Sequence, residues 1–300
     1  MINFLKKKLN LIDGIYNFEI KDASVKNVTD FYKDSPFPNY KVSDNKYTIK
    51  QKGDNNLLAS QFKKFIGYKK NILEVGCGTG QLSIYFSIGS NNNIVALDPT
   101  IESLRIAKNF ASKNIIKNIN FLNVDIFDDV LTENYFDFIW CNGVLHHTKN
   151  PSKGFDIISK SLKSNGYILV GLYNKYGRIR TIIRRFFYKI FGEIFVTILD
   201  PTLRNLKDNS EERKAWIRDQ YIHPIESLHT LDEVLLWFER NNIDFINSIP
   251  SCNLDYDYQN LFEKTSKGSF FSRMFNQFLM IFNKLGSDGG LFVVIGKKLK

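Results

Sequence analysis

A strand that runs directly into a glycine-rich turn is the feature that most restricts how this chain folds. Residues Ile72–Val75 are apolar apart from Glu74, the turn Gly76-Cys-Gly-Thr-Gly80 follows at once, and a helix is expected over Gln81–Ser87. Glycines let the backbone turn tightly and bring its N–H groups against a ligand at the positive end of a helix. The segment is therefore predicted to be a strand–turn–helix unit that binds a small ligand.

Apolar strands and helices alternate after this turn. Seven strands are expected, at Asn71–Val75, Asn93–Asp98, Ile119–Asp125, Phe136–Cys141, Tyr167–Tyr173, near Asp244–Ile249 and near Leu291–Lys297. The helices expected between them are Gln81–Ser87, Thr100–Ser112, Pro151–Leu162 and Thr230–Asn241. Strands that alternate with helices need crossover connections, which give a parallel sheet. The predicted fold class is α/β, with a doubly wound, Rossmann-like, mostly parallel sheet of seven strands.

The position of this sheet predicts how the chain is divided. Residues 1–70 are expected to form an irregular N-terminal extension with one helix, Asn56–Ile66, and residues 71–300 to form the domain itself. Two helical insertions interrupt the alternation, at about 174–229 and 250–288. We expect the extension and both insertions to build a cap over the carboxyl edge of the sheet.

Acidic residues lie near the ends of the first three predicted strands. Glu74 lies two residues before the first glycine, Asp98 ends the second strand and Asp125 ends the third. Ligands of open α/β sheets bind at this edge, and a carboxylate about 20 residues after the turn can bind both ribose hydroxyls. A nicotinamide or flavin site is the alternative, but the spacing is G-x-G-x-G and not G-x-G-x-x-G. Simple helix capping is the other interpretation of the two Asp residues.

Three motifs occur together: Ile72-Leu-Glu-Val-Gly-Cys-Gly-Thr-Gly-Gln81, Ala96-Leu-Asp-Pro99 and Phe136-Asp-Phe-Ile-Trp-Cys-Asn-Gly-Val-Leu-His-His147. As a combination they resemble the motifs of the class I S-adenosylmethionine-dependent methyltransferases, in the broad group that includes the ubiquinone and menaquinone biosynthesis enzymes. The resemblance covers about residues 71–173. It implies S-adenosylmethionine as the cofactor and an antiparallel last strand, but it does not identify the methyl acceptor.

The resemblance also implies which residues contact the cofactor. These are Glu74, Gly76, Cys77, Gly78, Gly80, Asp98, Pro99, Asp125, Ile126, Asn142 and Gly143. The glycine turn would face the methionine part and Asp98 the ribose hydroxyls. Asp125 with the Ile126 amide would hold the adenine, and Asn142 with Gly143 would line the methionyl side.

Two histidines beyond the fourth strand are candidates for acid–base chemistry. Methyl transfer is an in-line displacement, so orientation supplies most of the acceleration, and a base is needed only where the acceptor has a proton to lose. His146 and His147 are the nearest titratable groups, and His146 is preferred because it lies closer to the strand end. A structural role, in which the pair fixes the loop, is the alternative.

Polar residues after the fifth strand are candidates for contact with the acceptor. They are Tyr173, Asn174, Tyr176, Arg178 and Arg180. A loop that simply faces water is the competing interpretation. Further along, His223-Pro-Ile-Glu226-Ser-Leu-His229 has a spacing that suggests metal binding, but Pro224 disfavours one continuous helix and the motif is not H-E-x-x-H. No metal is therefore expected.

Each insertion contains an amphipathic segment. In Arg178–Ile198 apolar residues recur at the helical period for about five turns, with arginines mostly on the other side, and a similar stripe runs from Phe270 to Leu285. Burial of a large apolar side chain stabilises by about 1.5–3 kcal/mol, so such faces need a cover. Packing onto the domain as a lid is the expected cover, while self-association and a membrane interface stay open.

Composition narrows the cellular setting and the partners. Three scattered cysteines, the lack of an apolar run of about 18 residues and the lack of a signal-like start favour a cytoplasmic protein. The net charge of +10 arises mainly from scattered lysines. The preferred function is methylation of a small, apolar or lipid-like acceptor. The alternatives are an RNA or protein methyltransferase that docks through the basic helix, and a non-catalytic scaffold with the same fold; the oligomeric state is left open.

Overall fold

The computed structural model describes residues 3–33, 36–208, 210–253, 260–284 and 289–300. Its centre is a nine-stranded sheet in the order β1-β2-β5-β4-β3-β6-β7-β9-β8. The strands are β1 Asn10–Ile12, β2 Ile15–Asn17, β3 Asn71–Val75, β4 Asn93–Asp98, β5 Ile119–Asn123, β6 Phe136–Asn142, β7 Leu162–Tyr173, β8 Ile243–Ile249 and β9 Leu291–Lys298. The sheet is mostly parallel, which confirms the predicted α/β fold class.

The seven predicted strands are β3 to β9, and the last of them is antiparallel to both neighbours, β7 and β8, as expected. The other two strands come from the N-terminal extension, which was predicted to be irregular. The hairpin β1–β2 adds to the edge, where Ile15 pairs with Phe121 of β5. Strands of three residues are too short to show the two-residue alternation of a β-strand, so the sequence did not indicate them. In the structure Ile15 is buried at the edge of the sheet.

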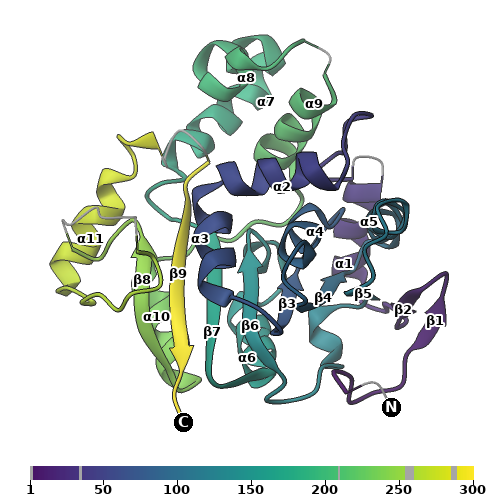
Figure 1. The fold of residues 1–300 in the computed structure, drawn as a ribbon. Helices are drawn as coiled ribbons and strands as arrows, with labels where there is room; N and C mark the ends of the chain where they lie inside the picture. The colour runs from purple at the N-terminus through teal and green to yellow at the C-terminus, as the bar shows by residue number, and fades with distance from the viewer. Residues whose placement is uncertain (1–2, 34–35, 209, 254–259, 285–288) are drawn as a thin grey trace.

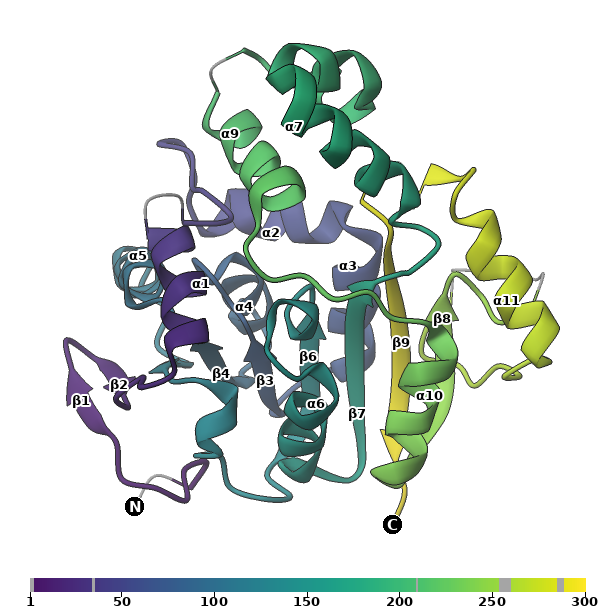
Figure 2. The same cartoon turned by 180° about the vertical axis from the view of Figure 1, so that it is seen from behind.

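Helices cover both faces of the sheet and its carboxyl edge (Figures 1 and 2). The α-helices are α1 Ala23–Lys33, α2 Lys46–Asn55, α3 Leu57–Ile66, α4 Gln81–Ser87, α5 Ile101–Lys113, α6 Pro151–Lys160, α7 Ile179–Leu199, α8 Pro201–Asn205, α9 Glu211–Ile217, α10 Leu231–Arg240 and α11 Phe270–Leu279. Short turns of other helix types are η1 Ile126–Asp128, η2 Leu145–His147 and the π-helical η3 Arg218–Ile222.

Two apolar cores form, one on each face of the sheet. Phe62 of α3, Phe86 of α4 and Leu104 of α5 are fully buried on one face. Phe155 of α6 and Phe238 of α10 are buried on the other face, where their rings stack. This two-sided burial explains why the central strands read as nearly continuous apolar runs.

The first insertion stands above the carboxyl edge, where Figure 1 shows α7, α8 and α9 stacked over the ends of the parallel strands. Helix α7 is not one continuous helix as predicted, because Gly192 has φ 73° and ψ −165° and breaks it. The second insertion forms α11 beside β8. Leu285, the last residue of its predicted apolar stripe, lies outside the described residues.

Candidate active site

The glycine turn after β3 forms the floor of the site. Gly76, Gly78 and Gly80 all have positive φ, in the region that favours glycine. Gly78 is also crowded, because a Cβ there would lie 2.2 Å from the carbonyl oxygen of Phe37. The Thr79 amide donates to that same carbonyl at 3.3 Å. The N-terminal extension therefore closes over the turn, and glycine is the residue that this close approach permits.

Carboxylates surround the turn at the ends of three neighbouring strands. The oxygens of Asp98 accept hydrogen bonds from the amides of Gly78 and Thr100, both at 2.8 Å. Burial raises the pKa of Asp98 against the opposing effect of these hydrogen bonds. Burial also raises the pKa of Glu74, to about 8, although the Ser83 hydroxyl donates to its carboxylate.

Asp125 caps the turn η1, where its side chain accepts from the Phe127 amide at 3.1 Å. Asp125 thus performs the capping that was the alternative interpretation, whereas Asp98 accepts from the amide of Thr100, the N-cap residue of α5, and does not itself cap the helix. Both Asp residues also line a cavity, so capping and lining are not exclusive.

A cavity of about 720 Å³ lies at the carboxyl edge of the sheet. Of the eleven residues predicted to contact the cofactor, ten line it: Glu74, Gly76, Cys77, Gly78, Asp98, Pro99, Asp125, Ile126, Asn142 and Gly143. Gly80 does not line it; a Cβ at this position would lie 2.9 Å from the Cβ of Ala107, so this glycine permits close packing of α4 on α5. Cys77 is buried and a free thiol.

The cavity is also lined by residues that the sequence did not indicate. Val25, Val28 and Tyr32 of α1 line it, together with Trp216 and Asp219 of the first insertion. The spacing i, i+3, i+7 of the three α1 residues is a helical signal that the prediction of an irregular extension missed. Nothing local marks Trp216 or Asp219, because the chain brings them to the cavity from the far end of the insertion.

Asp219 is the acidic group among these residues. Its carboxylate accepts from the hydroxyl of Tyr173 at 3.1 Å and from that of Tyr32 at 3.4 Å. The side-chain amide of Gln220 donates to it at 2.7 Å. Burial and the neighbouring Asp219 raise the pKa of both tyrosines above its ordinary value, so both hydroxyls stay protonated and donate.

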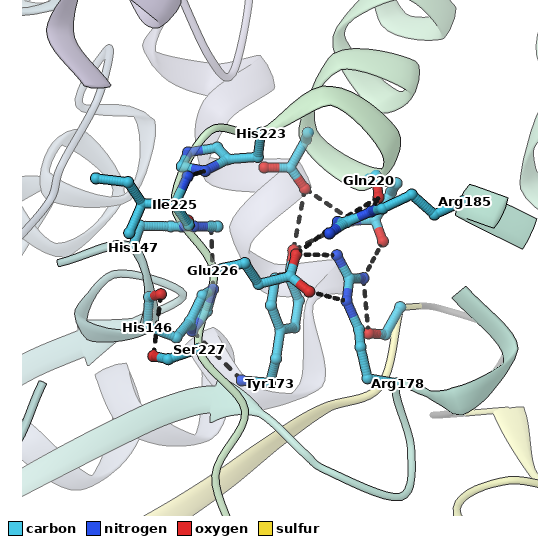
Figure 3. A network of polar contacts seen from close by, with 12 residues as sticks. His146, His147, Tyr173, Arg178, Arg185, Gln220, His223, Ile225, Glu226 and Ser227 are labelled. Carbon is cyan, nitrogen blue, oxygen red and sulfur yellow. Dashed lines mark hydrogen bonds and ion pairs between the residues drawn. The ribbon is translucent and has the colours of Figure 1, made fainter. Parts of the chain in front are cut away.

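The histidine pair has a fixed arrangement of protons (Figure 3). The Tyr173 amide donates to Nδ1 of His146 at 3.3 Å, so the proton of His146 lies on Nε2. His147 places Nδ1 2.8 Å from the carbonyl oxygen of Ile225, which only accepts, so its proton lies on Nδ1. Nε2 of His146 then donates to Nε2 of His147 at 3.0 Å. Both rings are satisfied, and burial lowers the pKa of each.

This arrangement reverses the preference for His146 as a base. His146 is fully buried and lies outside the cavity lining, whereas His147 lines the cavity. Even in His147 the one unprotonated nitrogen accepts from its neighbour. Within η2 the first histidine faces the interior and the second faces the cavity, so the residue closer to the strand end is the one farther from a ligand.

Arg178 lies in a buried network outside the cavity lining (Figure 3). Its guanidinium binds Glu226 through two hydrogen bonds, at 3.1 and 2.6 Å, and lies 3.7 Å from the ring of Tyr173. Arg185 contacts the same carboxylate at 2.7 Å. Burial alone would raise the pKa of Glu226, but the two arginines hold it below its ordinary value.

Of the five residues predicted to border the acceptor, only Tyr173 lines the cavity. Asn174 is buried and joins the two insertions, because its side-chain amide donates to Gln277 at 2.9 Å. Arg178 is buried, and Tyr176 and Arg180 are half-buried outside the cavity lining. The chain turns away from the crevice directly after β7, which its sequence did not indicate.

The segment with the metal-like spacing passes over the histidine pair. His223 stacks on His147 with ring centroids 3.7 Å apart, Glu226 binds the arginines, and His229 contacts Glu233 at 2.9 Å. The three side chains therefore point to different partners. Among the residues that the structure describes, no group of three or more His, Cys, Asp or Glu side chains is arranged to hold a metal ion.

The site can now be compared with known proteins. The sequence matches a family described as a methyltransferase domain over residues 66–242, more than half of the chain. The chain belongs to this methyltransferase family. This membership confirms the resemblance seen in the motifs. The predicted cofactor, S-adenosylmethionine, agrees with it.

Curated relatives are similar over part of their length. An uncharacterized protein of Synechococcus sp. is 27% identical over 202 residues, which cover 59% of this chain and 48% of that protein. The mitochondrial ubiquinone biosynthesis O-methyltransferase of Dictyostelium discoideum is 30% identical over 114 residues, or 35% of this chain and 36% of that enzyme. The methyltransferase chain thus spans half or less of the length of these relatives.

Solved structures share the fold at low sequence identity. PKMT2 from Rickettsia typhi has a TM-score of 0.56 at 14% identity, covering 94% of this chain and 56% of its own. The same protein in complex with AdoHcy has a TM-score of 0.55, covering 81% of this chain and 52% of its own, at 15% identity. A chain from the complex of the Haloferax volcanii Trm112 activator with a putative methyltransferase has a TM-score of 0.52 at 11% identity, covering 94% and 100%.

Proposed function

We propose that this methyltransferase transfers a methyl group from S-adenosylmethionine to a small, largely apolar acceptor that binds in the same cavity. One observation carries the proposal: one cavity of about 720 Å³ is lined both by the glycine turn with its carboxylates and by apolar side chains such as Val25, Val28 and Trp216. Small-molecule sites are mostly apolar clefts with a few placed polar groups. A donor and an acceptor that share one cavity can be held in line.

The residues at the turn fit this cofactor. Asn142 and Gly143 line the cavity directly after β6, so a ligand there meets a polar side chain and the peptide backbone. Gly76 and Gly78 of the turn line the cavity, so their backbone faces a ligand. Glu74, Asp98 and Asp125 supply acceptors for a ligand that carries an amine and hydroxyl groups.

When bound, the cofactor supplies a methyl group that is already activated on a positively charged sulfur. The chain's task is therefore to orient the acceptor and to exclude water, and orientation is worth about 7–11 kcal/mol in favourable cases. Val25 and Tyr32 of α1 and Trp216 of the first insertion line the cavity. These groups come from the N-terminal extension and the insertion, which supports their proposed role as a cap. We call Asp219, with Tyr32 and Tyr173 that donate to it, the acceptor end.

We assign the proton-accepting role to Asp219, for acceptors that carry a proton. Its Oδ2 is held by Tyr173 and Gln220, whereas Oδ1 receives only the longer contact from Tyr32 at 3.4 Å. That oxygen retains capacity to accept from a hydroxyl or amine of the acceptor. The proton then passes from the acceptor to the Asp219 carboxylate as the acceptor atom gains the methyl group.

An RNA or protein acceptor that docks on the basic helix has less support. Arg178 and Arg184 are buried, and Arg185 binds Glu226 and the Gln220 carbonyl. Phosphate binding needs basic side chains that are exposed, and these three arginines are engaged inside the molecule. A non-catalytic scaffold would not need the cavity or its carboxylates.

Cofactor binding tests the proposal directly. Calorimetry should detect binding of S-adenosylmethionine or its demethylated product, and Asp98→Ala should weaken it by about 2–4 kcal/mol, since charge-assisted hydrogen bonds to the ribose are lost. Asp156→Ala is the matched control, because Asp156 binds Arg240 and lies outside the cavity lining. Tight binding of a nicotinamide cofactor in place of S-adenosylmethionine would overturn the proposal. Mass spectrometry of co-purified metabolites would then identify the acceptor.

A further inference from the structure

The helices α7 and α11 pack against the molecule with their polar sides and expose their apolar sides, the reverse of what was expected. The side of α7 that faces the protein carries Thr181, Arg184 and Tyr188. They are three and four residues apart, so they lie on one face of the helix. Arg184 lies 3.8 Å from the buried Asp200, and the ring of Tyr188 stacks on Tyr221. The lid prediction, in which the apolar stripe packs on the domain, is therefore wrong.

The apolar face of α7, defined here as Ile182, Ile183, Phe186 and Ile190, points to solvent. These side chains are between 44% and 61% exposed, and Ile194 beyond the Gly192 kink reaches 84%. Each of these side chains exposes a large apolar surface to water, and burial of that surface would stabilise the molecule.

Helix α11 repeats the arrangement. Its inward residues, Asn276 and Gln277, are buried and bonded, to the Ser251 carbonyl and to the Leu231 amide. Its apolar face, defined as Phe270, Phe271, Met274, Phe275 and Phe278, is exposed, with Phe271 at 73%. Two separate insertions thus both bury amides or arginines and expose aromatic and aliphatic side chains.

The two helices share a common base. The Asn174 amide, in the turn that leads to α7, donates to Gln277 of α11 at 2.9 Å. Figure 2 shows the start of α7 and the end of α11 approaching each other beside β9. The two helices that carry the apolar faces are therefore joined at one place in the molecule.

Exposed basic residues border these faces. Lys189, seven residues after Ile182, lies along the edge of the α7 face, and Lys175, Lys267 and Lys284 are exposed near the ends of the two helices. Helix α11 has no acidic residue, and the one acid of α7, Glu193, binds Arg213 at 2.8 Å. Apolar side chains with a basic border are typical of helices that lie in the interface of an anionic membrane.

We propose that α7 and α11 dock this protein on the surface of an anionic lipid bilayer. A second copy of the chain is the competing occupant, but a twofold interface would set each basic border against itself. Anionic head groups complement that border and acyl chains cover the phenylalanines. Among the helices of the described residues, none has both the length and the apolar character to cross a bilayer. Docking would be peripheral.

Vesicle sedimentation tests this inference with the full chain and does not depend on methyl transfer. Vesicles of phosphatidylcholine with about 30% phosphatidylglycerol should bind the protein at physiological salt, and pure phosphatidylcholine should bind it more weakly. The triple variant Ile183→Gln, Phe186→Gln, Ile190→Gln should lose about 100-fold in partitioning. Lys175→Gln with Lys189→Gln should lose about fivefold for each lysine removed.

The control variant changes exposed apolar residues elsewhere. Leu11→Gln, Ile12→Gln and Leu236→Gln replace side chains that are 59%, 53% and 62% exposed, and together they should leave vesicle binding unchanged. Circular dichroism and thermal unfolding should be unaltered in all of these surface variants. Wild-type protein that stays in the supernatant with the anionic vesicles would refute the proposal. So would a dimer, seen by analytical ultracentrifugation, that the α7 triple variant dissociates.

Discussion

The two ends of the cavity are built in different ways. At the cofactor end, Asp98 binds Gly78 and Thr100, which lie 20 and 2 residues away along the chain. At the acceptor end, Asp219 binds Tyr32 and Tyr173, which lie 187 and 46 residues away. The first end rests on backbone amides of the central sheet, whereas the second depends on side chains from the extension and an insertion.

This difference has a physical consequence. Backbone amides are present whatever the side chains are, so the cofactor end depends mainly on the fold and on a few carboxylates. The acceptor end depends on side chains that meet only when α1, η3 and β7 are all in place. We therefore expect substitutions at the acceptor end to change stability and acceptor chemistry while cofactor affinity stays nearly constant. The predictions below test that separation.

The largest effect is expected at Arg178, which is buried outside the cavity lining and packs against the ring of Tyr173. Arg178→Met leaves Glu226 buried with only Arg185 as its charged partner, and removal of one partner of a buried ion pair costs about 3–5 kcal/mol. Urea unfolding measures the loss. The control is Arg240→Met, whose half-exposed pair with Asp156 should contribute less than about 1 kcal/mol. Equal losses of unfolding free energy in the two variants would show that the buried ion pairs of Arg178 stabilise the fold no more than a surface pair does.

The second prediction concerns the acceptor chemistry of Asp219. Asp219→Asn removes the proton acceptor but keeps the size of the side chain, so kcat should fall about 100-fold or more. Cofactor affinity, measured by calorimetry, should change less than about threefold. His147→Gln provides the contrast, since both of its ring nitrogens are engaged within the fold. If His147→Gln abolishes turnover while Asp219→Asn retains it, the base is His147.

A smaller effect is expected from the buried histidines under mildly acidic conditions. Burial, with His147 nearby, lowers the pKa of His223 to about 3, so the folded chain keeps it neutral while the unfolded chain protonates it below about 6.5. Stability is thus lost as the pH falls from about 6.5 toward 3, by about 1.4 kcal/mol per such histidine at pH 5.5.

Unfolding free energies at pH 7.5 and 5.5 measure this loss. Glu74 and Asp98, whose pKa values burial raises, act in the opposite direction, so the comparison is made between the wild type and His223→Leu. The variant should lose about 1.4 kcal/mol less than the wild type on acidification. An identical pH dependence in the two proteins would contradict a neutral, buried His223.

The smallest effect is expected at the cofactor end, through Glu74. Its pKa of about 8 means that the free protein carries this carboxyl protonated at pH 7. A positively charged cofactor favours the ionised form, so binding releases a proton and affinity rises with pH, by less than about tenfold in total between pH 5.5 and 7. Calorimetry in buffers of different ionisation enthalpy counts the proton. Glu74→Gln should bind without this pH dependence; if the slope persists, another group titrates.

Much of the cofactor end was predictable because its information is local. Gly76 to Gly80 directly follow a buried strand, and Asp98 and Asp125 stand at the ends of the next two strands. In a parallel sheet those ends meet at one edge, so the sequence order alone brings the three motifs to one crevice. The family follows from the same motifs, and the methyltransferase match over residues 66–242 confirms it.

The acceptor end and the outward faces were decided by the tertiary structure. Tyr32 and Asp219 meet across 187 residues, and no local pattern encodes such a contact. The apolar period of α7 is visible in the sequence, but a period defines two sides of a helix without saying which one faces the protein. That choice was made by Asp200 and Glu226, which hold Arg184 and Arg185 inward and so turn Phe186 to solvent. Buried charges need partners, and where the fold supplies them the polar side of the helix is the one that packs.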